Sequence, residues 1–218
     1  MIHIVVDLEM NPVRQNLKEV RRYLTDEVIE IGAVKLDDKF NQISEFQCYV
    51  RPEHSKITRH IKKLTGITDE LLEDKNVFAV EFKNFMDWIV ADEVTIYSWS
   101  NSDINQLKSE CAFKLKDFDT QWLEDHWVDL QKQFDDRIGL HNNLALNHAV
   151  GAMNKNFKGT QHTALADAIN TAAILTLMQD EDAFKKTMQP IIDLINPKRL
   201  SSSIGELYPE LSKLKFDE

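Results

Sequence analysis

The chain has 218 residues, 43% apolar and 28% charged, a balance typical of one soluble globular domain. Its 26 Lys and Arg face 36 Asp and Glu, which gives a net charge of −10. Proteins that hold nucleic acid through overall charge carry a basic excess, so this balance argues against a high-affinity polyanion-binding module. An enzyme with local or metal-mediated contacts remains compatible with it.

Targeting and redox signals are sparse. The sequence contains no apolar run long enough for a membrane helix, and its start lacks the order of a signal peptide. Cys48 and Cys111 are expected to be buried free thiols. Together these features predict a cytoplasmic protein with no membrane contact.

Strands are predicted mainly in the first half of the chain. The first is apolar on both faces apart from His3, which is typical of a central strand covered on both sides. The next two are predicted to form an antiparallel hairpin around a turn at residues 37–39, and Asn11 with Pro12 predicts a turn after the first strand. The predicted strands span residues 2–9, 28–36, 44–50, 93–98 and 127–130.

Helices dominate the second half. Residues 78–89 place apolar side chains at i, i+4, i+7, i+8 and i+11, which predicts one apolar helix face. Residues 163–178 are apolar almost all round and predict a buried helix. The predicted helices span residues 58–65, 69–72, 78–89, 103–113, 144–153 and 163–178. Early strands followed by alternating helices predict an α/β fold with a mixed sheet.

Two acids close the first strand. Side chains alternate along a strand, so Asp7 and Glu9 share one face. Two carboxylates at the end of a buried strand repel each other and lose solvation, and a divalent cation would offset both costs. The alternative is a strand that ends at the surface with two solvated acids.

Similar chemistry recurs twice later in the chain. Asp103 follows the fourth predicted strand, and Asp92, which precedes that strand, is the alternative third acid. His162 and Asp167 are five residues apart, about 500° around a helix, so they would not share a face of one regular helix. We therefore expect His162 on the loop that enters the helix and Asp167 one turn inside it, both facing one cleft.

These motifs, in this order, resemble those of the DEDD exonucleases of the histidine type (DEDDh), in the superfamily of ribonuclease T and DNA polymerase III epsilon. The surrounding segments resemble the branch that holds Eri-type RNA exonucleases and bacterial KapD-type proteins. Those segments are residues 27–36, 61–68, 103–111, 127–134 and the stretch around His162. The resemblance predicts an exonuclease domain over residues 1–180, followed by a C-terminal helical extension, 181–218, whose role it does not explain.

The resemblance implies an RNase H-like fold, a central mixed five-stranded sheet with helices on both faces. It implies removal of nucleotides from 3′ ends with two Mg²⁺ or Mn²⁺ ions, hard cations that prefer oxygen ligands. Asp7 would contact both metals, Glu9 and Asp167 would hold the metal on the side of the attacking water, and Asp103 the metal facing the leaving oxygen. His162 would be the general base, and an ordinary histidine pKa of about 6.5 suits that role.

The resemblance also implies contacts with the terminal nucleotide. Leu8 and Met10 flank the first acids, and Leu64 and Thr65 would lie against the last base. Trp99 would stack on a base. Core packing is the alternative for Met10, Leu64, Thr65 and Trp99.

Two departures from the family pattern concern substrate contacts. Met10-Asn11-Pro12 stands where relatives often have a threonine-rich turn, and Ser102 stands where an aromatic residue often precedes the third acid. The polar stretch to Thr25 predicts a loop or a short helix over the site. Its basic residues form either a local phosphate patch or a solvated loop: Arg14, Lys18, Arg21 and Arg22.

The sequence thus predicts a metal-dependent 3′→5′ exonuclease acting on single-stranded ends, with RNA favoured over DNA. The alternatives are a DNA proofreading or repair exonuclease of the same fold, and a catalytically silent exonuclease-like module that binds a partner. The five filled catalytic positions argue against silence. The biological substrate, the metal used in the cell and the oligomeric state stay open.

Overall fold

The first strand of the chain lies at the centre of a mixed sheet. The computed structural model describes residues 1–195 except 92, 142 and 154. In it, β1 (Ile2–Pro12) pairs antiparallel with β2 (Asp26–Leu36) and parallel with β4 (Val94–Ser98). The sheet order is β3-β2-β1-β4-β5, with β3 (Gln42–Tyr49) and β5 (Trp127–Asp129) at its edges. The predicted mixed five-stranded sheet is confirmed.

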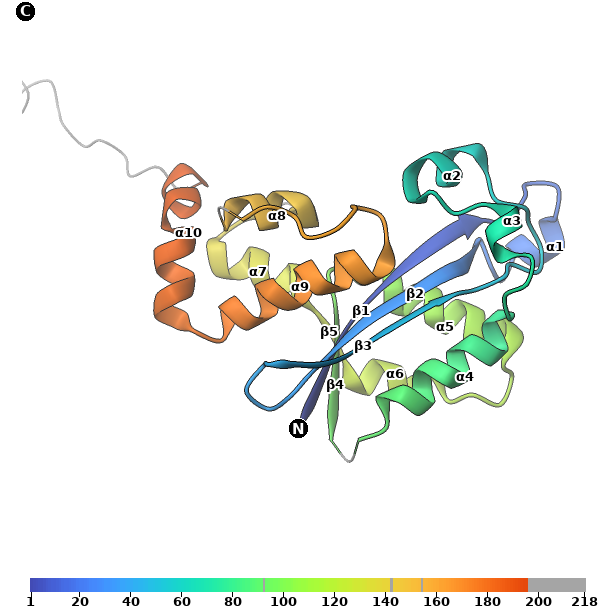
Figure 1. The fold of residues 1–218 in the computed structure, drawn as a ribbon, viewed down its shortest axis with the longest axis horizontal. Helices are drawn as coiled ribbons and strands as arrows, with labels where there is room; N and C mark the ends of the chain where they lie inside the picture. The colour runs from blue at the N-terminus through green and yellow to red at the C-terminus, as the bar shows by residue number, and fades with distance from the viewer. Residues whose placement is uncertain (92, 142, 154, 196–218) are drawn as a thin grey trace, which may run out of the picture.

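Helices cover both faces of this sheet (Figure 1). On one face, Ile4 and Val6 of β1 pack with side chains of α4 (Phe78–Ile89) and α5 (Ser102–Lys114). On the other face, Val5 packs with α9 (Ala164–Met178). Each fully buried valine or isoleucine stabilises the fold by about 1.5–3 kcal/mol, so the unbroken apolar run of β1 fixes it as the central strand.

The remaining helices are short, apart from the last. They are α1 (Lys18–Arg21), α2 (Arg59–Thr65), α3 (Asp69–Leu72), α6 (Thr120–His126), α7 (Leu130–Ile138), α8 (Leu146–Ala152) and α10 (Glu181–Ile195). Phe184 and Met188 bury α10 against the same core as α9. This helix is the described part of the predicted extension, and residues 196–218 lie outside the described residues. Within the described chain, no helix combines the length and apolarity needed to span a bilayer.

The predicted turn at Asn11 and Pro12 is wrong. Strand β1 continues through both residues to Pro12, which pairs with Asp26, after a register shift between Glu9 and Met10. Proline is tolerated there because it is the last residue of the strand and needs no further ladder donor. The Asn11 side chain is fully buried and bonds the segment at Lys56 and Thr58 rather than closing a turn.

A glycine allows α9 to lie directly on the sheet. Gly32 of β2 pairs with Asp7 of β1. A Cβ placed on Gly32 would lie 2.1 Å from the backbone nitrogen of Leu165, a distance that no side chain can occupy. The absence of a side chain at Gly32 therefore brings the first turn of α9 over the acidic end of β1.

Candidate active site

Asp7 and Glu9 lie side by side on one face of β1, as the strand alternation predicts. Asp7 is opposite Gly32 and Glu9 is opposite Glu30 in the antiparallel pair with β2. Glu9 is only 8% exposed and Asp7 is half-buried. Strand β1 continues past both residues and Glu9 is buried, so the alternative of two solvated acids at a strand end is wrong.

Asp103 joins this pair from the first turn of α5. It is 4% exposed, and its Oδ1 accepts a hydrogen bond of 3.1 Å from the backbone N–H of Leu8, between the two acids of β1. The Ser102 hydroxyl donates to its other carboxylate oxygen. The helix start and the strand are thereby tied together at the acids. Asp92, the alternative third acid, lies outside the described residues.

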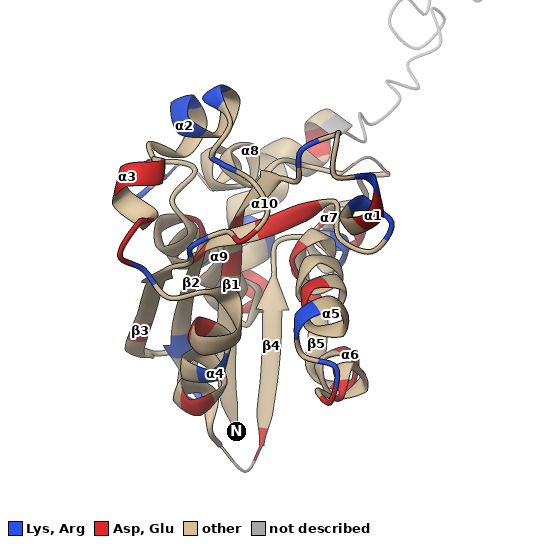
Figure 2. Ribbon diagram, turned by 90° about the vertical axis from the view of Figure 1, so that its right-hand side faces the viewer, with Lys and Arg blue, Asp and Glu red and all other residues tan. Residues whose placement is uncertain are grey.

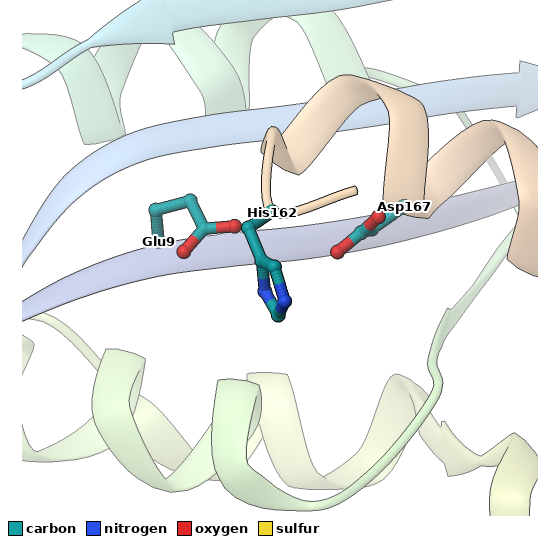
Figure 3. A group of neighbouring side chains, drawn as sticks. All are labelled: Glu9, His162 and Asp167. Atoms are coloured by element: carbon teal, nitrogen blue, oxygen red, sulfur yellow. The ribbon is translucent and has the colours of Figure 1, made fainter. Parts of the chain in front are cut away.

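His162 and Asp167 approach from the opposite side, at the start of α9. His162 lies on the entering loop with a positive φ of 63°, and Asp167 lies in the first helical turn. Atoms of Glu9, His162 and Asp167 that can bind a metal all lie within 4.8 Å of one another (Figure 3). A positive φ is strained for a residue other than glycine, and such strain clusters at functional sites.

Glu30 is a site residue that the sequence motifs do not reveal. It is 1% exposed, its Oε2 accepts from the backbone N–H of Ala164 at 3.3 Å, and the Gln47 amide donates to its Oε1 at 2.7 Å. Glu30 therefore holds the first turn of α9, which carries Asp167, against β2. The available signal was an acid within the apolar run of residues 28–34.

Burial and mutual repulsion shift the pKa of every acid in the cluster upward. Burial is the main cause, and it raises the pKa of Glu9 to about 8, that of Asp103 to about 7 and that of Asp167 to about 6. Asp7 shifts well above its usual pKa range, first through burial and then through the charges of Asp103, Asp167 and Glu9. These carboxylates resist ionisation together because no opposite charge relieves them.

The donor set fits divalent cations. Among the described residues, no Lys or Arg forms an ion pair with any of the four carboxylates. Oδ1 of Asp167 is buried and accepts no hydrogen bond from any described residue. An orphaned buried carboxylate oxygen beside other acids suits a hard cation such as Mg²⁺ or Mn²⁺. The fold and this site together define a candidate metal centre at the end of a mixed sheet.

The residues predicted to contact the nucleotide differ in how accessible they are. Trp99 is 7% exposed in the core, and its indole N–H donates to the Leu144 carbonyl, so its ring is not available for base stacking. Leu8 is buried in the opposite core cluster. Met10 and Thr65 are half-buried, and the Thr65 hydroxyl closes the end of α2. Leu64 is 38% exposed on α2, which packs against β1.

Comparison with known proteins gives the family. A family model described as "Exonuclease" and named RNase_T matches residues 4–175. The chain belongs to this family, the DEDDh 3′→5′ exonucleases. The predictions of family, enzyme class and fold are confirmed.

The names of relatives in the family state different activities. "Probable 3'-5' exonuclease KapD" of Bacillus subtilis is 28% identical over 169 residues, which cover 76% of this chain and 80% of the relative. "DNA polymerase III subunit epsilon" of Buchnera aphidicola is 28% identical over 173 residues, 77% of this chain and 72% of the relative. "ERI1 exoribonuclease 2" of Mus musculus is 27% identical over 93% of this chain, which spans 32% of that protein.

Solved structures share the fold. The nuclease domain of 3'hExo, described as a DEDDh family member bound to rAMP, superposes with a TM-score of 0.71 at 21% identity over 83% of this chain and 92% of that one. A complex of E. coli ExoI with single-stranded DNA gives a TM-score of 0.65 at 18% identity over 85% of this chain and 42% of that one. The RNase H-like fold is therefore shared across this level of sequence divergence.

Proposed function

We propose that this exonuclease removes nucleotides from single-stranded 3′ ends with two divalent ions, and that it prefers RNA to DNA. The observation that carries the mechanism is the convergence of four carboxylates, from β1, α5 and α9, with no cationic side chain paired to them in the described chain. Burying these charges is costly, and bound metal would offset the cost.

Each carboxylate has a proposed role. The charges of Asp103, Asp167 and Glu9 all act on Asp7, which would contact both cations. Glu9 and Asp167 would hold one cation, and Asp103 the other. Divalent cations, when bound, supply positive charge to the attacking and leaving oxygens of an in-line displacement. The four side chains would hold the cations in a fixed position, because each side chain is carried by a strand or by the first turn of a helix.

His162 is proposed as the general base. Its imidazole is exposed and lies close to Glu9 and Asp167, so it can take a proton at a ring nitrogen and release it to solvent. The same closeness would also allow it to bind metal. The two roles differ in what a substitution at His162 removes: turnover alone, or metal affinity as well.

The preference for RNA is supported by relatives. ERI1 exoribonuclease 2 is matched over most of this chain, and the 3'hExo nuclease domain is bound to rAMP. A DNA exonuclease is the second candidate, because a DNA polymerase III epsilon subunit and a DNA complex of ExoI are also similar. The two candidates share the catalytic site and differ in how the terminal sugar is recognised.

The test uses 5′-labelled single strands of RNA and DNA with one sequence, incubated with Mg²⁺ or Mn²⁺ or with excess chelator. We expect ladders that shorten from the 3′ end, faster on RNA, and no products in chelator. A third substrate, RNA with one deoxynucleotide at its 3′ end, isolates the 2′-hydroxyl. Faster digestion of DNA would favour the second candidate, and undiminished digestion in chelator would contradict the metal mechanism.

A further inference from the structure

Positive charge is concentrated in two short segments of this acidic chain. Residues 14–22 and 51–63 contain nine of the 26 Lys and Arg but only two of the 36 Asp and Glu. The rest of the chain is therefore even more acidic than its net charge of −10 suggests. Such local concentration within an acidic protein points to a polyanionic partner at that place.

The fold brings both segments to the end of β1. The backbone N–H of Arg14 donates to the Ser55 hydroxyl at 2.8 Å. Asn11 of β1 donates to the Lys56 carbonyl at 3.2 Å and accepts from the Thr58 N–H at 2.9 Å. Asn11 is two residues beyond Glu9, about 7 Å along a strand, so the basic segments begin beside the catalytic acids.

Helix α2 presents three of these charges on one face. Arg59, Lys62 and Lys63 are spaced i, i+3 and i+4, and all three are exposed. None of them forms an ion pair with a described residue, whereas like charges at i, i+4 slightly destabilise a helix. Lys62 and Lys63 lie in the last turn, where positive charge is favourable to a helix, so the face can keep its three unpaired charges available to an anionic ligand.

The neighbouring surface limits where an anion can lie. A hollow of about 540 Å³ is lined by the segment at residues 51–56 and by α3, and its walls mix Arg14 and Lys56 with Glu70 and Glu73. Figure 2 shows the basic α2 next to the acidic α3. Acidic groups in the hollow would repel a polyanion, so the face of α2 is the favourable path.

We propose that the Arg59, Lys62 and Lys63 face of α2 binds the phosphates of the single strand upstream of its 3′-terminal nucleotide. This inference rests on the proposed function, because it assumes that the 3′ end lies at the acids of β1. The contacts are made to phosphates, so they carry no sequence preference and weaken with salt. They also explain how a chain of this net charge holds a polyanion: only locally, beside the catalytic site.

The test compares two triple variants. Arg59→Gln/Lys62→Gln/Lys63→Gln removes the α2 charges, and Lys39→Gln/Lys83→Gln/Lys186→Gln removes three exposed lysines elsewhere as a matched control. Binding of a labelled 12-nucleotide strand is measured by fluorescence anisotropy in Ca²⁺ over a range of salt. Hydrolysis of the p-nitrophenyl ester of thymidine monophosphate, which has no upstream phosphate, is measured in Mn²⁺.

The α2 variant should bind the strand about tenfold more weakly at low salt. Its plot of log affinity against log salt should be shallower by about 2, since each single-strand phosphate contact contributes about 0.7. Its hydrolysis of the small ester should equal that of wild type, and the control variant should match wild type throughout. Equal strand binding and equal salt slopes for the two variants would overturn the inference.

The two proposals can fail separately. If the wild type hydrolyses neither the ester nor a strand while the α2 variant still binds the strand more weakly than the control, the surface stands and the proposed function falls. If hydrolysis is normal and the α2 variant binds the strand as tightly as the control, the proposed function is supported and the proposed binding surface is contradicted.

Discussion

Two groups of carboxylates in this protein differ in their electrostatic surroundings. In the first, Asp7, Glu9, Asp103 and Asp167 converge without a Lys or Arg partner among the described residues, and burial raises the pKa of each. In the second, Glu27 and Glu110 are fully buried around one ammonium group. Both groups draw on β1 or its neighbour β2 and the helix α5.

The acids of the second group have partners within the chain, although burial still raises the pKa of Glu110. Nζ of Lys114 lies 3.0 Å from Glu27, 2.8 Å from Glu110 and 2.9 Å from Glu53. Backbone N–H groups of Glu53 and His54 also donate to Glu27. Although burial alone would raise it, the pKa of Glu27 is lowered, because these hydrogen bonds and the Lys114 charge outweigh burial.

Pairing within the chain distinguishes the structural acids around Lys114 from the unpaired acids of the candidate site. A buried acid that is paired within the chain stabilises the fold as it stands. A buried acid left unpaired costs stability unless something outside the chain supplies the opposite charge. We therefore expect substitutions in the two groups to have opposite consequences for activity and stability.

The largest expected effect is on turnover when the unpaired group is changed. Asp7→Asn, Glu9→Gln, Asp103→Asn and Asp167→Asn should each remove nearly all exonuclease activity and leave the fold intact, since each keeps the shape and deletes a ligand charge. The losses should not add in pairs, because the acids act as one unit. Steady-state rates beside circular dichroism spectra provide the check, and wild-type turnover in any one variant would remove that acid from the site.

His162 should have the next largest effect. His162→Ala should lower kcat by about 10²–10⁴-fold, the usual contribution of a positioned base, while Mn²⁺ affinity survives. The pH dependence of the rate should differ between the two proteins, because only the wild type has a side chain at this position that can take the proton.

The measurement for His162 is a pH–rate profile of both proteins, with Mn²⁺ affinity from calorimetry. A variant that keeps the turnover and the pH dependence of the wild type would make His162 structural. A variant that loses metal affinity would make it a ligand.

In the paired group, the largest loss should be of stability. Lys114→Met leaves Glu27 and Glu110 buried without their cation, and breaking a buried pair in this way costs about 3–5 kcal/mol of unfolding free energy. The protein that remains folded should keep its kcat. Urea unfolding measures the loss, with Lys83→Met, which removes an exposed pair with Asp87, as the control that should change little. A stable but inactive Lys114→Met would break the distinction between the two groups.

Glu30 should behave as a positioning residue for the start of α9. Glu30→Ala leaves the Ala164 N–H without its acceptor and frees the turn that carries Asp167, so kcat should fall by about 10–100-fold. Glu30→Gln keeps an acceptor oxygen and should lose much less. Comparing kcat, KM and Mn²⁺ affinity in the two variants tests this, and equal losses would assign the effect to the charge of Glu30 rather than to its hydrogen bond.

Much of this site was predictable because local sequence patterns place its residues on strands and helices. Strand alternation placed Asp7 and Glu9 on one face, and helical periodicity placed His162 on the entering loop and Asp167 inside the helix. The structure agrees on each placement. The catalytic roles of these residues stay predictions.

The parts that were not predicted depend on contacts between distant segments. Glu30 acts on Ala164, 134 positions away, and Asn11 leaves its expected turn because residues 56–58 offer it partners. No local pattern reports either contact. Helix α7 is different, because its sequence did contain a local signal. Leu130, Phe134 and Ile138 follow a helical spacing, and Asp129 caps the helix start. The predicted strand at 127–130 obscured this signal.

A more general effect is on the pH dependence of stability without metal. The acids of the unpaired group have raised pKa values in the folded protein, so the folded state binds more protons than the unfolded state between their ordinary pKa, near 4, and about 8. In chelator, the unfolding free energy should therefore fall as pH rises through this range. One pKa unit corresponds to about 1.4 kcal/mol, so the change is measurable by urea unfolding. A stability that rose over the same range would contradict the shifts.

The most direct test of the central claim is the unfolding free energy of wild type and Asp7→Asn at pH 8, each in chelator and in Mn²⁺. If the unpaired acids form a metal site, Mn²⁺ stabilises the wild type by about 2.7 kcal/mol at a hundred times its Kd. Asp7→Asn should be more stable than wild type in chelator and respond much less to Mn²⁺. A wild type indifferent to Mn²⁺, together with an Asp7→Asn variant less stable than wild type in chelator, would show that the acids are structural and contradict the account.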